Sequence, residues 1–283
     1  MSKKSVLYLT AYNIKRWKSR YHVIMGLIYL CILGDMMLGP TRKLISVLGV
    51  KPTAFAFPLI WNSTLFLMMF FFGVILFFSD APFLDDMSPF FIIRCGKMKM
   101  AAAQVLYIIV VSTLIPTCFF VIQALFLPVS LGNSWGKFWG TIAQTNASLA
   151  TGSRMDFSYE ILWDYEPMEA NLIVFCMCIL LCMLTGLFLY YCCILHMRTL
   201  GICILSGFTV LPHIVNGLTA STSCFHFTTF NWLSPYSFIS LDQTMREYNG
   251  SLPSLDYAFR VLLIGNLLLI GLILLETRRK EIG

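Results

Sequence analysis

A row of polar side chains inside one apolar stretch is a candidate for binding or catalytic chemistry. The row consists of Ser206, Thr209, His213 and Asn216. Successive steps of three, four and three residues place these side chains on one face of a helix. Polar groups in an apolar helix face either other helices or a wet cavity. The row therefore indicates either a path for a solute or ordinary hydrogen bonding between helices.

Two asparagines in other apolar stretches extend this interpretation. Asn62 lies in the second apolar stretch and Asn266 lies in the last. An amide inside a membrane helix needs a partner or water, as the row above does. We therefore expect six pathway residues: Asn62, Ser206, Thr209, His213, Asn216 and Asn266.

The sequence patterns of known catalytic chemistry are absent or out of context. G-x-S-x-G occurs at residues 132–136, but it follows an apolar stretch, whereas a nucleophile elbow needs a strand before the serine and a helix after it. Ser206 and His213 would be about 10 Å apart along one helix, too far for a hydrogen bond. No phosphate-binding G-x-x-x-x-G-K-[ST] loop and no H-E-x-x-H occurs. The sequence predicts no catalytic residue, so the chain is not expected to be an enzyme.

A metal site is the other chemistry to weigh. Cys192, Cys193 and His196 share one predicted helix end at a spacing that could ligate a metal. Most of the ten cysteines lie inside apolar stretches, where cysteine packs as a small apolar residue. We therefore predict packing here and no metal site.

Six long apolar stretches must position all of these residues. They cover residues 21–39, 57–79, 101–128, 170–195, 199–218 and 257–276. A helix needs roughly 20 apolar residues to cross a bilayer, and a helix satisfies its own backbone groups there without water. Charged residues make up only 12% of the chain, against about a quarter in soluble domains. The predicted fold is an all-α integral membrane protein with six transmembrane helices in a single domain, residues 1–283.

The distribution of basic residues predicts the orientation. Six Lys or Arg precede the first span, three follow the second, one follows the fourth and three follow the sixth, so thirteen of twenty lie on one side. The positive-inside rule makes that side, with both termini, cytoplasmic. The longest external segments, 129–169 and 221–256, are shorter than a typical domain of about 50 residues or more. The net charge of +6 thus reflects topology and does not indicate nucleic acid binding.

The first 20 residues are predicted to form an amphipathic helix on the inner membrane surface. Leu7, Ala11, Ile14, Trp17 and Tyr21 recur at helical spacing among basic residues. Such a helix is either a dedicated docking element or a plain positive-inside flank.

Residues 80–100 are the most informative cytoplasmic segment. Ser88 before Pro89 is typical of a helix start, and Gly96 would end the short helix Pro89–Arg94. This helix would expose four consecutive apolar residues, 90–93, with acids before it and bases after it. It therefore packs either against another protein, or against lipid or its own bundle.

The run FFSDAPFLDDMSPFFIIRCGKMKM resembles the permease subunits of bacterial ATP-binding cassette (ABC) exporters of the type-2 class. In that family a segment of SDAPF kind precedes a coupling helix and an Arg-x-Gly-[Lys/Arg] turn, here Arg94–Lys97. LSPYS before the sixth span, at residues 233–237, also fits, whereas Met100 stands where an aromatic residue often closes the turn. The resemblance covers the full length by topology but only about twenty residues by motif.

The resemblance implies that the chain is the membrane-spanning half of an exporter in the plasma membrane. ATP and Mg would be bound by a separate ATPase subunit, with no cofactor in this chain, and a second permease copy or a homologue would complete the transporter. The residues implied to couple to the ATPase are Phe83, Asp85, Asp86, Phe90, Phe91, Ile93, Arg94, Gly96 and Lys97.

The expected cargo is an amphipathic or lipid-like molecule, such as a peptide or an antibiotic. The predicted helices that would form the walls of a transport path are apolar and carry few charges. A sensor or immunity protein that binds without transporting is a second hypothesis. An intramembrane enzyme acting on lipid or peptide is a third, and it would need facing catalytic groups at one depth.

Overall fold

The structure is a computed structural model, and it confirms that the chain is helical. It describes residues 3–15, 21–79, 88–128, 130, 132–145, 159–221, 232–242, 244 and 252–282. Within these ranges no strand forms, and the only pairing of β type is one isolated bridge between Thr53 and Ser130.

Five of the described helices are long and apolar enough to cross a membrane. They are α2 (Tyr21–Leu48), α6 (Lys97–Phe126), α10 (Pro167–Ile194), α11 (Arg198–Ser221) and α12 (Leu255–Ile282). Helices α2, α11 and α12 contain the predicted stretches 21–39, 199–218 and 257–276, whereas α6 and α10 end two residues and one residue before the predicted ends at 128 and 195. The longest, α6, has 30 residues and is therefore about 45 Å long, more than the roughly 30 Å of the hydrocarbon core.

The predicted span at residues 57–79 differs from the other five because it is not one helix. It forms a single turn, α3 (Phe57–Ile60), and then α4 (Thr64–Phe78), with a break between them. Ser63 has an extended conformation and its hydroxyl accepts a hydrogen bond from the Phe66 amide at 3.4 Å, which makes it the N-cap of α4. With 15 residues, α4 is about 22 Å long and cannot cross a bilayer by itself.

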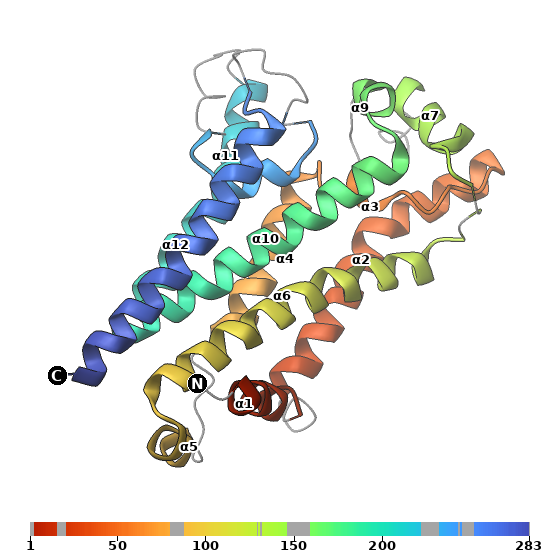
Figure 1. The fold of residues 1–283 in the computed structure, drawn as a ribbon. Coiled ribbons are helices and arrows are strands. Elements are labelled where there is room, and N and C mark those ends of the chain that lie inside the picture. Colours follow the sequence, from red (N-terminus) through yellow and green to blue (C-terminus); the bar gives the residue numbers. More distant parts are fainter. Residues whose placement is uncertain are drawn as a thin grey trace.

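Helix α10 lies at the centre of the bundle, where it packs against α4, α6, α11 and α12 (Figure 1). Gly186 permits the close approach of two neighbours. A Cβ at this position would lie 2.7 Å from Cγ2 of Ile108 on α6 and 3.1 Å from the ring of Phe78 on α4. Small residues let membrane helices approach closely, so the packing of the bundle centre depends on this glycine.

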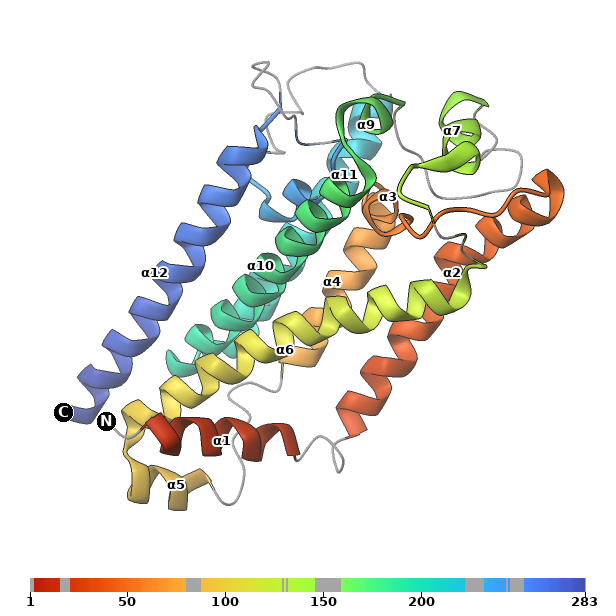
Figure 2. The ribbon, with the colours of Figure 1, turned by 45° about the vertical axis from the view of Figure 1, so that its right-hand side comes forward.

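The two ends of the bundle carry different elements (Figure 2). At one end, α1 (Lys3–Lys15), α5 (Ser88–Cys95) and the carboxyl end of α12 lie together. At the other end lie α3, α7 (Gly136–Thr145) and α9 (Tyr159–Asp164). Helix α1, α5 and the carboxyl end of α12 therefore share one end of the bundle.

Helix α1 crosses the end of α6 and is fixed there by both polar and apolar contacts. The Thr10 hydroxyl donates to the backbone oxygens of Ala103, at 3.2 Å, and of Val6, at 3.0 Å. Leu9 is buried against Met100 and Ala103. The predicted N-terminal amphipathic helix exists over residues 3–15, and residues 16–20 lie outside the described ranges.

We predict that Gly186→Ala lowers the stability of the bundle, because its methyl group would overlap Ile108 and Phe78; overpacking typically costs about 1–3 kcal/mol. Gly207 on α11 is the matched control, since a Cβ there meets no atom within 4 Å. Gly207→Ala should be neutral or stabilising by up to about 1 kcal/mol. Thermal unfolding in detergent measures both, and equal effects would contradict the packing role of Gly186.

Candidate functional site

Two discontinuous segments enter the bundle and meet each other. One is the break between α3 and α4 at residues 61–63, and the other is η3 (Pro235–Ile239), a short 3₁₀ helix within the predicted external segment 221–256. Residues 234 and 236–241 are all buried, so this part of the segment lies inside the protein. Irregular backbone is tolerated at membrane depth only where protein buries it or where it lines a water-filled cavity.

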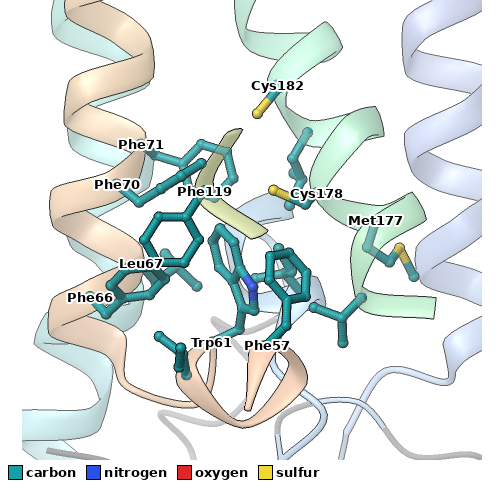
Figure 3. Packing of buried hydrophobic residues seen from close by; sticks show 14 of the residues in the cluster. Phe57, Trp61, Phe66, Leu67, Phe70, Phe71, Phe119, Met177, Cys178 and Cys182 are labelled. Atoms are coloured by element: carbon teal, nitrogen blue, oxygen red, sulfur yellow. The ribbon is translucent and has the colours of Figure 1, made fainter. Parts of the chain in front are cut away.

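Trp61 fixes the break by aromatic packing. Its ring is fully buried and makes edge-to-face contacts with Phe66 and Phe70, with centroids 5.0 and 4.8 Å apart. Phe57 from α3 and Phe119 from α6 complete the surroundings, at 5.7 and 6.4 Å (Figure 3). Such pairs are worth about 0.5–1.5 kcal/mol each beyond the area they bury, so the cluster gives this turn one defined position.

Hydrogen bonds join the two discontinuous segments to each other. The Ser240 hydroxyl donates to Oδ1 of Asn62 at 3.1 Å, which connects the end of η3 to the break. The Ser234 hydroxyl donates to the backbone oxygen of Phe208 on α11, also at 3.1 Å. The hydroxyls of Tyr236 and Thr185 on α10 lie 2.9 Å apart. The segment containing η3 is thus bonded to the break and to both neighbouring helices.

His213 brings α11 to the same place. Its Nδ1 lies 3.2 Å from Oγ1 of Thr64, the first residue of α4. The imidazole is nevertheless exposed on the surface of this single chain. A histidine facing lipid is costly, so an exposed one within a span is expected to face a wet cavity or another protein. We call Asn62, Thr64, His213 and Ser240 the break cluster.

The other predicted pathway residues have different surroundings. Thr209 is fully buried and donates to Leu205 of its own helix, while Ser206 and Asn216 are half-buried. Asn266 donates to the backbone oxygens of Leu180, at 3.0 Å, and of Leu262, at 2.8 Å. The amide of Asn266 therefore joins α12 to α10. Of the six residues, Asn62 and His213 lie in the break cluster, and Asn266 has no contact with it among the interactions described.

Helix α6 carries buried polar residues that the sequence interpretation missed. Gln104, Ser112 and Gln123 are 1%, 0% and 2% exposed. Both amide atoms of Gln104, Oγ of Ser112 and Oε1 of Gln123 have no hydrogen-bond partner among the described residues. Their spacings of eight and eleven residues place them within about 100° of one another around a helix of 3.6 residues per turn. The spacing indicates a shared side of the helix. It is hard to recognise in the sequence, because these residues are widely separated within a long apolar run.

The predicted coupling helix forms at the end of the bundle that carries α1. It was expected at Pro89–Arg94 and extends over Ser88–Cys95. Phe90 and Ile93 are 63% and 81% exposed. Gly96 follows with φ of 87°, a conformation that favours glycine, and α6 begins at Lys97. A one-residue turn thus joins the exposed helix to the longest helix of the bundle.

Other predicted coupling residues are only partly visible. Phe83, Asp85 and Asp86 lie outside the described residues, and Phe91 is described only as part of the backbone of α5. The Arg94 and Lys97 side chains are exposed.

Cys192, Cys193 and His196 lie at the carboxyl end of α10. The Met197 amide donates to Cys192 O at 2.9 Å and the His196 amide to Cys193 O at 3.1 Å, while His196 has φ of 62°. This is the Schellman arrangement that closes a helix. No group of three or more potential metal ligands occurs within the described ranges. The backbone atoms of these residues therefore form the cap that ends α10.

Comparisons with protein families, with curated proteins and with solved structures found no match.

We predict that Thr64→Val and His213→Leu are energetically coupled, because each removes one side of the same hydrogen bond. Interhelical hydrogen bonds in membranes average about 0.6 kcal/mol, with a maximum near 1.7. A double-mutant cycle on unfolding in detergent measures this coupling. Thr64→Val combined with Asn266→Leu is the control, because these residues share no partner and should be additive. Additivity in the first pair would mean that the bond contributes nothing to stability.

Proposed function

We propose that the chain is the membrane-spanning permease subunit of an ABC exporter of the type-2 class, moving an amphipathic peptide, antibiotic or lipid-like cargo out of the cell. ATP and Mg would be bound by a separate ATPase subunit. The observation that carries this proposal is α5, a short helix outside the spans with bulky apolar side chains left uncovered.

The exposure of α5 supports a protein partner. Apolar anchors such as Phe90 and Ile93, 63% and 81% exposed, are the kind of side chain that dominates interface energetics once buried in a pocket. Arg94 stands beside them, and arginine is also enriched at such sites. A groove on an ATPase subunit would cover these side chains.

The connection of α5 to the bundle supports a mechanical role. Gly96 alone separates α5 from α6, and α6 packs against α2, α10 and α12. Helix α1 is bonded to the same end of α6. A displacement of α5 by a closing ATPase would therefore reach most of the long helices through α6. Transport steps commonly use such shifts of packed helices.

The break cluster supports a substrate path. Transporters often bind their substrates near discontinuous membrane helices, whose interrupted backbone lines the site. Here the path would pass the break cluster and the polar side of α11, Ser206 to Asn216. Polar atoms of Gln104, Ser112 and Gln123, which have no hydrogen-bond partner among the described residues, would supply further polar contacts along α6. Asn266 is better explained by its interhelical hydrogen bonds.

The orientation and the second subunit belong to the same proposal. The end with α1 and α5 would face the cytoplasm, because basic residues such as Lys15, Arg94, Lys97 and Arg278 lie in the elements there. The exposed His213 would face a second permease copy or a homologue, or the path between the two, and the assembly would reside in the plasma membrane.

We predict that Phe90→Asp and Ile93→Asp release the ATPase during detergent purification. Each places a charge where the proposed interface buries an apolar anchor, and unpaired charges in such positions are strongly unfavourable. Co-purification of an ABC ATPase subunit expressed together with this chain measures the effect, and the amount of permease in the membrane should not change.

Phe90→Leu and Ile93→Leu are the matched controls, since they keep an apolar side chain at the same positions. Both should retain the ATPase. Undiminished co-purification with the aspartate variants would contradict the coupling role of α5.

We also predict that the purified chain hydrolyses no ATP by itself, because it lacks a phosphate-binding loop. ATP hydrolysis in proteoliposomes should appear when the ATPase subunit is added and should fall with Phe90→Asp. Turnover by the chain alone would end the permease proposal. Ligand binding by the chain with no ATPase partner in the cell would favour the sensor or immunity hypothesis instead.

A further inference from the structure

A cavity of about 150 Å³ lies between α2, α4 and α6. Its walls come from one half of α2, the half nearer to α1, from the second half of α4 and from the middle of α6. They include Gly26, Leu30, Phe70, Val74, Ile115 and Cys118. The walls are almost entirely apolar, and the cavity has no part in the break cluster or in α5.

Tyr29 joins two walls of the cavity, α2 and α4. Its hydroxyl donates to the backbone oxygen of Met69 on α4 at 2.6 Å, so this polar group is already occupied. Its ring lies directly on Gly73, where a Cβ would come within 2.5 Å of the ring. The bond and the close contact join α2 to α4 beside the cavity, and Gly26 on α2 leaves the space open because it has no side chain.

The cavity continues to the outer surface of α2. Leu27 lines it and is 45% exposed, and the adjacent Ile24 and Ile28 are 52% and 49% exposed. In a membrane, this outer surface of α2 contacts the acyl chains of the lipids. The opening therefore faces hydrocarbon and not water.

We infer that the acyl chain of a membrane phospholipid inserts into this cavity. Lipid tails are as apolar as leucine, so no hydrophobic driving force acts between them and the walls. In an empty cavity, however, the lining atoms lack dispersion contacts. The end of an acyl chain restores these contacts, and neither the chain nor the cavity has to be dehydrated. An apolar cavity of about 150 Å³ holds a molecule of benzene size, which corresponds to a short length of one chain. The inference does not depend on the proposed function.

Photolabelling of the full chain tests this inference. The chain is reconstituted in vesicles of phosphatidylglycerol and phosphatidylethanolamine that contain a phospholipid with a diazirine on its acyl chain. We expect adducts on Val74 and Ile115, whose side chains are only 2% and 9% exposed, because only an inserted chain reaches them. Adducts on Leu268 of α12, which is 61% exposed, report general lipid contact.

Gly26→Leu should fill the cavity, because a Cβ there points at the Phe77 ring, 3.4 Å away, which also lines it. Adducts on Val74 and Ile115 should be lost, while those on Leu268 should remain and show that the bundle is intact. Gly271→Leu is the matched control, since a Cβ at Gly271 meets no atom within 4 Å; it should keep all adducts.

Several results would overturn the inference. One is the absence of adducts on Val74 and Ile115 in the unsubstituted chain, and another is their persistence in Gly26→Leu. Crosslinks from the thiol of Cys118 to a second copy of the chain, in place of lipid adducts, would assign the cavity to a protein contact. Loss of the Val74 and Ile115 adducts on addition of a peptide cargo, with the lipid unchanged, would assign it to cargo.

Discussion

The absence of water from the bilayer core is the constraint on which this structure depends. Every backbone amide and carbonyl at that depth must find a partner within the protein. Five helices meet most of this requirement through regular helical hydrogen bonding, although Pro40, Pro116 and Pro212 interrupt it in three of them. The segment at residues 57–79 does not, because it stops at Ile60 and starts again at Thr64. The break therefore has to be buried by other parts of the chain.

The burial of the break is achieved by aromatic and polar contacts together. Trp61 and its phenylalanine neighbours exclude lipid from the turn, and the Ser63 side chain caps the new helix. The segment containing η3 covers the remaining side, with Ser240 bonded to Asn62. Two irregular segments thus protect one another. This arrangement leaves polar groups inside the bundle, which an uninterrupted sixth helix would not have required.

The two parts of the molecule with the strongest functional signals lie toward opposite ends and share one central scaffold. Exposed α5 ends one residue before α6 begins, and the break cluster lies where the break before α4 meets α11 and the end of η3. Helix α10 packs against α4, α6 and α11, and Gly186 brings Phe78 and Ile108 into contact with it. The two ends are therefore connected by the long helices and by the close-packed side chains between them, and such packing transmits strain because it is barely compressible.

Most of the helices can be predicted from the sequence, because hydropathy and capping act locally. The long apolar runs predicted five of the long helices, and Ser88, Pro89 and Gly96 predicted α5 to within one residue at each end. Asn62-Ser63-Thr64 also carried a capping signal, but the surrounding apolar run outweighed it and the interruption was missed. Tertiary structure alone decided which polar residues meet. His213 and Thr64 are 149 positions apart, and Asn266 turned toward α10 instead of the break cluster. Such choices depend on how helices rotate and pack against one another, and a periodic pattern in one helix does not specify its neighbour.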